Sequence, residues 1–226
     1  MKIDLGYNFK NKKLLETAIT HTSFTHENKR KDIEDNERLE FLGDAVLELV
    51  ISSYIFKKFG ELSEGELTKL RASIVCESSL AERARVLKIG ENLRLGKGEE
   101  QTGGKERDSL LADAFEAIIG AIYIDSNNIE KVSEFIIKQM ENTILEKRKS
   151  FLKNDCKTYL QELIQKNSKI PIEYTIIEED GPAHNKMFTV SVIHNGKILG
   201  EGKGKSKKDA EQNAAQVAIK IIESKI

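Results

Sequence analysis

Apolar residues recur every three to four positions along the first two thirds of the chain, a period typical of amphipathic helices. Segment 95–108, LGKGEEQTGGKERD, interrupts this pattern with glycines and charged residues and is predicted to be a loop. We therefore expect an all-α N-terminal domain. Its predicted helices cover six segments: 11–19, 36–58, 64–75, 77–88, 109–124 and 128–147.

The hydrophobic pattern changes in the last third of the chain. Segment 170–180, IPIEYTIIEED, is rich in β-branched and aromatic residues, and Asn195-Gly196 joins two further strand patterns as a tight hairpin turn. Ser206 is a favourable N-cap for the last helix. We expect an α+β domain with the order α-β-β-β-α, in which the elements are 155–166, 170–180, two strands within 186–204, and 206–223.

Charge divides the chain near the same place. The formal net charge is −1, yet residues 149–226 carry 13 Lys+Arg against 10 Asp+Glu, while residues 1–148 carry 23 against 27. The charged segment 146–155, EKRKSFLKND, is the expected boundary. We predict domains at 1–148 and 154–224 with a linker at about 149–153. An acidic larger domain joined to a basic smaller one suggests two separate tasks.

Segment 36–49, NERLEFLGDAVLEL, concentrates acids on one side of its predicted helix. Like charges at such spacing repel by a few tenths of a kcal/mol per pair. A solvated face and a bound cation both account for the pattern, although a solvated face usually mixes charges of both signs. Phe41 lies beside the acids, either as an ordinary exposed apolar residue or as a contact for a second subunit. The acids are Glu37, Glu40, Asp44 and Glu48.

Segment 108–125, DSLLADAFEAIIGAIYID, is apolar nearly all round, which is typical of a buried helix, yet it contains Asp113 and Glu116 on one face. A buried carboxylate is paired, protonated or bound to a metal ion, because leaving it unpaired costs several kcal/mol. Arg107 and Arg71 are candidate ion-pair partners. Two acids facing a second acidic helix favour a divalent cation, and Mg²⁺ binds a few carboxylates plus waters. No His or Cys cluster in the sequence indicates zinc.

These two motifs, together with THTSFTHE (20–27) and LSEGELTKLRASIV (62–75), resemble the catalytic domain of ribonuclease III, an endonuclease specific for double-stranded RNA. Thr22 departs from the family pattern, in which arginine is common, and affects no catalytic position. The resemblance implies supporting roles for Glu37 and Glu64 near the scissile strand. It implies that the catalytic, Mg²⁺-binding acids are Glu40, Asp44, Asp113 and Glu116.

The C-terminal motifs GPAHNKMF and KSKKDAEQNAA resemble a double-stranded RNA-binding domain. Lysines at the start of its last helix oppose the helix macrodipole, and this placement is explained if phosphates bind there. The resemblance implies contacts from the first helix, from a loop between strands and from the lysine-rich helix start. The implied RNA-binding residues are Gln161, Glu162, Gly181, Pro182, Ala183, His184, Lys205, Lys207 and Lys208.

The resemblance implies a Mg²⁺-dependent endoribonuclease that cleaves double-stranded RNA to 5′-phosphate and 3′-hydroxyl ends in precursors of ribosomal and messenger RNA. It also implies a homodimer, and the exposed position inferred for Phe41 places this residue at the expected interface. Two competing hypotheses are a protein that only sequesters double-stranded RNA and a processing factor that uses the dimer as a scaffold. The complete set of four acids disfavours both, because a pure binder has no need of acids in a buried helix.

The sequence also bears on location. No apolar run approaches the ~18 residues that span a bilayer, and the N-terminus lacks the apolar core of a secretory signal. Cys76 and Cys156 match no metal-binding spacing and are typical of reduced thiols. We therefore expect a cytoplasmic protein without a membrane partner.

Overall fold

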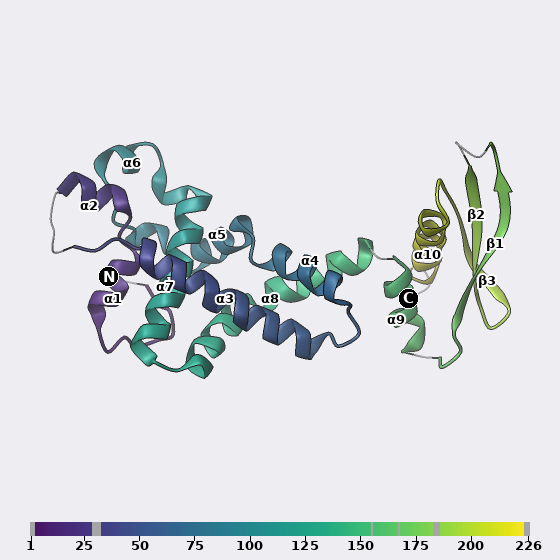
Figure 1. Cartoon of the computed structure of the whole chain (residues 1–226), viewed down its shortest axis with the longest axis horizontal. Coiled ribbons are helices and arrows are strands. Elements are labelled where there is room, and N and C mark those ends of the chain that lie inside the picture. The colour runs from purple at the N-terminus through teal and green to yellow at the C-terminus, as the bar shows by residue number, and fades with distance from the viewer. Residues whose placement is uncertain (1–2, 29–32, 155, 167, 183–185, 224–226) are drawn as a thin grey trace. The chain divides into compact units, whose positions relative to one another are not determined.

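The structure is a computed structural model that describes residues 3–28, 33–154, 156–166, 168–182 and 186–223. The chain divides into two compact units, Met1–Lys147 and Arg148–Ile226. The first unit is built from helices and the second contains the sheet (Figure 1). Within the described ranges, no helix combines enough length with enough apolar character to span a bilayer.

The first unit is helical, as its sequence predicts. Two short helices were not predicted: α2, whose sequence TSFTHEN lacks an apolar period, and α6, which lies in the segment predicted as a loop. The helices are α1 Lys12–Ala18, α2 Thr22–Asn28, α3 Glu37–Lys58, α4 Glu64–Ile74, α5 Glu77–Val86, α6 Lys97–Gln101, α7 Asp108–Ser126 and, as far as Lys147, α8 Ile129–Asn154, with 3₁₀ turns η1 Gly90–Asn92 and η2 Gly104–Glu106.

Helix α8 runs further than the sequence pattern predicts. It ends at Asn154, so residues 149–153, the predicted linker, belong to its last turns. The charged residues that suggested a connector are lysine, arginine and glutamate, which are good helix formers, and no glycine or proline interrupts them. The limits of the two domains stay a prediction.

Helix α7 forms the centre of the first unit. Its side chains are buried on nearly all sides, as its apolar sequence predicts, and Phe115, Ile118 and Ile119 are fully buried. Helix α3 makes an extensive contact with α7. The two helices run antiparallel, because Gly43 lies against Glu116 while the preceding turn of α3 lies against Gly120.

Backbone hydrogen bonds between three segments fix the start of α3. The Arg94 N–H donates to the carbonyl of Ile19 over 2.8 Å, which ties the segment after η1 to the end of α1. The Asn36 N–H donates to the carbonyl of Thr20 over 2.9 Å, immediately before α3 begins. Thr20 and Asn36 are both buried. This network holds the acidic first turns of α3 in place.

The second unit packs two helices on one face of a three-stranded antiparallel sheet of order β1-β2-β3 (Figure 1). Asn195 and Gly196 have φ values of 49° and 73°, the left-handed conformations that the predicted tight hairpin turn requires. The elements are α9 Cys156–Gln165, β1 Ile172–Asp180, β2 Met187–His194, β3 Lys197–Gly204 and α10 Lys207–Glu223.

Glycines of β3 allow α10 to lie directly on the sheet. A Cβ on Gly200 would lie 2.7 Å from the nitrogen of Ala218, and a Cβ on Gly204 would lie 2.8 Å from the carbonyl carbon of Asp209. Leu160 of α9 is fully buried in the same core. The close packing fixes the first turn of α10, where the predicted RNA-binding lysines begin.

Candidate active site

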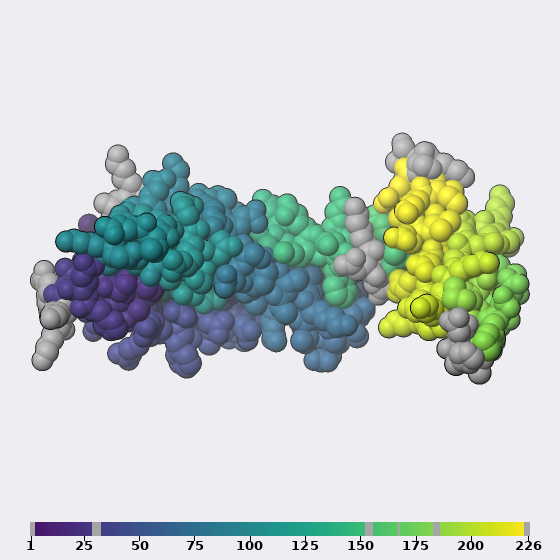
Figure 2. Space-filling view, turned by 90° about the horizontal axis from the view of Figure 1, so that it is seen from above, coloured from purple at the N-terminus to yellow at the C-terminus, as the bar shows by residue number. Residues whose placement is uncertain are grey.

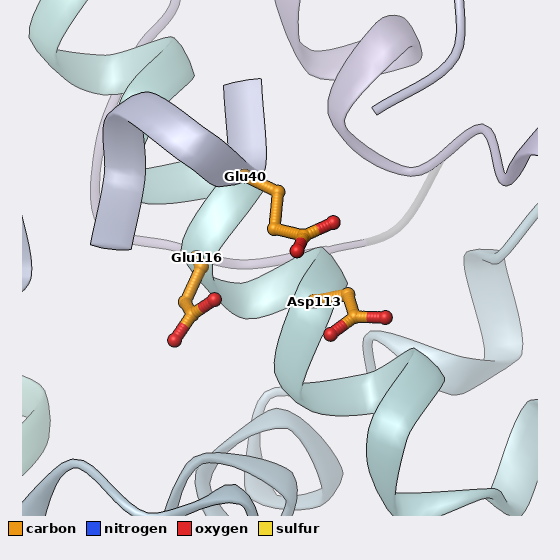
Figure 3. A group of neighbouring side chains, drawn as sticks. All are labelled: Glu40, Asp113 and Glu116. Atoms are coloured by element: carbon orange, nitrogen blue, oxygen red, sulfur yellow. The ribbon is translucent and has the colours of Figure 1, made fainter. Parts of the chain in front are cut away.

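Helices α3 and α7 bring three carboxylates together. Ligand oxygens of Glu40, Asp113 and Glu116 all lie within 4.8 Å of one another, and all three residues are partly buried. Figure 3 shows Glu40 projecting from α3 beside Asp113 and Glu116 on successive turns of α7. Residues i and i+3 share a helix face, so the spacing of the two α7 acids accounts for their common direction.

Burial and mutual repulsion raise the proton affinity of this trio. Burial, followed by the charges of Asp44, Glu40 and Asp113, raises the pKa of Glu116 to about 8. Burial and then the charge of Asp113 raise the pKa of Glu40. Burial also raises the pKa of Asp113, although the charge of His21 opposes that shift. A divalent cation would relieve the repulsion, because oxygens of several carboxylates are ligands that Mg²⁺ prefers.

The arginines proposed as alternative partners bind elsewhere. Arg107 Nη1 lies 2.5 Å from Glu99 Oε1, and Arg71 Nη1 donates to Ser52 Oγ over 3.1 Å. In the parts of the chain that the structure describes, no lysine or arginine forms an ion pair with any member of the trio. The three residues therefore fit a divalent metal ion: their donors are oxygens, they converge, and none of them forms an ion pair with a described lysine or arginine.

The other predicted acids lie around the trio rather than in it. Asp44 is exposed one turn after Glu40 on α3, and its charge raises the pKa of Glu116 more than that of any other neighbour. Glu37 is exposed in the first turn of α3, and its charge contributes to the raised pKa of Glu40. Glu64 begins α4, where its Oε1 accepts a hydrogen bond from the Thr68 hydroxyl over 3.1 Å.

Two charged neighbours of Asp113 did not emerge as site residues from the sequence. The charge of Glu77 on α5 raises the pKa of Asp113, and that of His21 lowers it. In the neutral form of the ring, His21 Nδ1 accepts a hydrogen bond from the Ser23 N–H over 3.2 Å, whereas the charge that acts on Asp113 belongs to the protonated form. His21 appears in the sequence only as part of the THTSFTHE motif, and no spacing links either residue to α7.

Exposed apolar side chains line the outer face of α3. Phe41 is 81% exposed, and Leu49 and Phe56 are 60% and 68% exposed. A groove of about 680 Å³ lies between α3 and the start of α8, and Leu49 and Ile129 line it. Such a row of large apolar residues is uncommon on a monomer surface and is typical of an interface.

The predicted RNA-binding residues of the second unit lie at three places. Gln161 is exposed on α9, while Glu162 Oε1 accepts a hydrogen bond from Arg148 Nη2 over 2.7 Å. Gly181 has a φ of 91°, and its N–H donates to Asp180 Oδ1 over 2.8 Å. Pro182 is exposed after it, whereas Ala183 and His184 lie outside the described residues.

The predicted RNA-binding lysines lie at the start of α10, a helix that is visible on the face shown in Figure 2 (yellow). Lys205, Lys207 and Lys208 are all exposed. Lys207 Nζ lies 3.6 Å from Glu179 Oε1 and 5.7 Å from the centre of the Phe188 ring. Exposed ion pairs of this kind contribute little free energy, so a phosphate can readily replace the carboxylate.

Comparisons with known proteins agree with both units. The family profile Ribonuclease-III-like matches residues 11–144, and Double-stranded RNA binding motif matches residues 156–222. Ribonuclease 3 of Listeria monocytogenes is 51% identical over 218 residues, covering 95% of this chain and 93% of the relative. Ribonuclease 3 of Geobacillus kaustophilus is 54% identical over 218 residues, covering 96% of this chain and 88% of the relative.

Solved structures show the same likeness. The nuclease domain of ribonuclease III from Campylobacter jejuni is 46% identical, with a TM-score of 0.57, and covers 61% of this chain and 92% of that one. Dicer from Pichia stipitis is 26% identical, with a TM-score of 0.52, and the match covers 95% of this chain and 96% of the Dicer chain.

A helical nuclease unit followed by a double-stranded RNA-binding unit defines a class of endoribonuclease that acts on double-stranded RNA. The chain belongs to the ribonuclease III family. The predictions of the fold class and of an endoribonuclease are thereby confirmed.

The raised pKa of Glu116 predicts a pH dependence of stability in the absence of metal. Between pH 4.5 and about 8 the folded protein holds a proton on Glu116 that the unfolded chain has lost. The free energy of unfolding therefore falls as pH rises through this window. After a discount for partial exposure we expect a loss on the order of 2 kcal/mol.

Urea denaturation in EDTA across this pH range measures the effect. Glu116→Gln should flatten the pH dependence, whereas Glu82→Gln, a change at an exposed position of α5, should leave it as in the wild type. If the free energy of unfolding depends on pH in the same way in the wild type and in Glu116→Gln, the raised pKa of Glu116 is not the cause of that dependence.

Proposed function

We propose that this chain is a Mg²⁺-dependent endoribonuclease that cleaves double-stranded RNA and leaves 5′-phosphate and 3′-hydroxyl ends. The observation that carries the proposal is the convergence of Glu40, Asp113 and Glu116 within 4.8 Å. Asp44 is the proposed fourth metal-binding acid, because its charge acts on both Glu40 and Glu116. Glu37 and Glu64 have proposed supporting roles near the scissile strand.

The chemistry divides between the cation and the protein. Mg²⁺ bound by these acids would supply a water of lowered pKa and offset negative charge on the phosphate. The ionised oxygens of Glu40, Asp113 and Glu116 would hold the cation in place, and their partial burial would strengthen that attraction because less water screens it. Hydrolysis that releases the 3′ oxygen of the scissile phosphate leaves the proposed ends.

The second unit would retain the substrate, because the acidic site repels RNA. The lysines at the start of α10 are exposed and fit phosphate binding at a helix N-terminus. Gln161, Glu162, Gly181 and Pro182, together with Ala183 and His184, are the proposed contacts to successive minor grooves. Such recognition follows the shape of the duplex over ~16 base pairs. Precursors of ribosomal and messenger RNA are the proposed substrates.

A homodimer is the proposed assembly, with Phe41 at its interface. The exposed row of Phe41, Leu49 and Phe56 and the groove beside it support this proposal. The nuclease domain from Campylobacter jejuni is described as structurally flexible in a region involved in its dimer formation. Two copies would supply two acidic sites, one for each RNA strand.

The cytoplasm is the proposed location. Cys76 and Cys156 form no disulfide, and one is half-buried and the other buried. Cysteines without a disulfide fit a reducing compartment.

Glu116→Gln tests the proposed site directly. The substitution keeps the size of the side chain but removes its charge, so we expect kcat to fall about 1,000-fold, or ~4 kcal/mol of transition-state stabilisation. Cleavage of a labelled RNA duplex in Mg²⁺ and binding of the same duplex in EDTA provide the two readouts. Binding should be unchanged.

Glu82→Gln, on the exposed face of α5, is the matched control and should cleave like the wild type. A wild-type protein that binds duplex RNA in Mg²⁺ without cleaving it would refute the enzymatic function. A Glu116→Gln variant that cleaves at the wild-type rate would refute the site instead.

The double variant Lys207→Ala, Lys208→Ala tests the proposed phosphate contacts. Each lysine that neutralises a phosphate releases counterions, so the slope of log K against log salt should decrease in magnitude by about 2. Duplex RNA binding measured across a salt series gives this slope. Lys220→Ala, an exposed lysine in the last turn of α10, should leave the slope unchanged. An unchanged slope in the double variant would contradict the proposal that these lysines contact the phosphates of the RNA.

Phe41→Ala tests the proposed dimer. Loss of a large aromatic contact at the interface should raise the dimer dissociation constant about 30-fold, or ~2 kcal/mol. Sedimentation velocity over a range of protein concentrations measures the shift. Val86→Ala changes an apolar side chain on α5 that is 62% exposed, and it should not alter the association. Equal dissociation constants for the wild type and Phe41→Ala would exclude Phe41 from the interface.

A further inference from the structure

Two glycines lie at the closest approach of α3 and α7. Gly43 and Gly120 are buried in the interiors of these helices, where glycine is less favourable than alanine because it loses more backbone entropy on folding. Neither residue has a positive φ, so the conformation of the backbone does not require glycine there. The reason for glycine must be the space that a Cβ would occupy.

The space beside Gly43 is filled by the backbone of a residue in the candidate active site. A Cβ on Gly43 would overlap the carbonyl oxygen of Glu116 and would lie 2.6 Å from its carbonyl carbon, whereas real Cβ atoms keep more than 3.0 Å from such neighbours. The same Cβ would lie 3.0 Å from the nitrogen of Gly120. A backbone carbonyl cannot rotate away as a flexible side chain can, so the helix itself would have to move.

Gly120 repeats this arrangement from the opposite helix. A Cβ on Gly120 would overlap the carbonyl oxygen of Leu39 and would lie 3.1 Å from its carbonyl carbon, and Leu39 directly precedes Glu40. Each glycine thus packs on the backbone at or beside an acid of the other helix. The two contacts set the separation of α3 and α7 at the level of Glu40, Asp113 and Glu116.

We propose that Gly43 and Gly120 are positioning residues for the metal site, which hold α3 and α7 close enough for Glu40 to share a cation with Asp113 and Glu116. This inference rests on the metal-dependent function proposed above. Mg²⁺ demands near-ideal octahedral geometry with ligands at 2.0–2.1 Å, so the site has little tolerance for a wider separation. Ca²⁺ accepts ligands at 2.3–2.6 Å in flexible geometry and tolerates more.

Because Mg²⁺ tolerates a wider site less well than Ca²⁺ does, comparing the binding of the two ions distinguishes a positioning role of the glycines from a purely structural one. In Gly43→Ala, the new Cβ forces the backbone of Glu116 away from α3 and moves its carboxylate away from that of Glu40. Mg²⁺ binding should then weaken more than Ca²⁺ binding. A change that only loosened the fold would weaken both alike.

The experiment uses the full chain without RNA and measures Mg²⁺ and Ca²⁺ dissociation constants by isothermal titration calorimetry, with thermal unfolding in EDTA as the measure of folding. For Gly43→Ala we expect the Mg²⁺ constant to rise about tenfold or more and the Ca²⁺ constant by less than about threefold. Gly120→Ala should show the same order of effects. Gly98→Ala is the matched control, because a Cβ there meets nothing within 4 Å, and it should match the wild type.

The outcomes distinguish this inference from the proposed function. A wild-type chain that binds neither ion would refute the proposed metal site itself. A wild-type chain that binds Mg²⁺, together with a Gly43→Ala variant of equal Mg²⁺ affinity, would overturn the positioning role alone. An equal loss of Mg²⁺ and Ca²⁺ affinity in Gly43→Ala would also overturn the positioning role. Failure of both Gly43→Ala and Gly120→Ala to fold at 20 °C would also overturn the positioning role, because the glycines would then be required for folding rather than for the metal site.

Discussion

The contact between α3 and α7 is the constraint on which the rest of the molecule depends. It brings Glu40, Asp113 and Glu116 into partial burial, which disfavours their charged forms and raises their pKa values. The buried apolar side chains of α7 offset this cost. Each large side chain, such as Phe115 or Ile118, contributes about 1.5–3 kcal/mol when fully buried. The stability of α7 thus supports a cluster of charges that would not assemble by itself.

An acidic cluster of this kind requires a second source of affinity for RNA. Charges on a protein surface act over about 10 Å at moderate salt, so the repulsion of phosphates by the acids is local. The exposed lysines at the start of α10 are the proposed source of attraction, in a different unit of the chain, and packing of α10 on Gly200 and Gly204 of β3 holds that helix start in place. The division of charge along the sequence therefore corresponds to a division of tasks between the two units.

The sequence predicts the parts that depend on local patterns. Periodicity identified the long helices, and Asn195-Gly196 identified the hairpin. Helix α2 was missed because it is held by tertiary contacts: Ser23 Oγ accepts from the Gly96 N–H over 2.9 Å. The sequence predicted a site of four acids, because Asp113 and Glu116 stand out in an apolar helix; the structure brings Glu40, Asp113 and Glu116 together, and the role of Asp44 as a ligand stays a prediction. Glu77 and His21 were not predicted as site residues, since only the folded chain brings them to Asp113.

Local rules are broken at the places where function is proposed. Acids occur in the apolar helix α7, lysines oppose the dipole at the start of α10, and glycines interrupt α3 and α7. Each is unfavourable for its own helix, and each has a reason only at a larger scale: the proposed cation between helices, the proposed phosphate at a helix end, or a backbone in close contact. Gly43 connects the two scales, because the atom it lacks would occupy the place of the Glu116 carbonyl. Conflicts between local preference and the whole fold are expected where function, rather than stability, determines the residue.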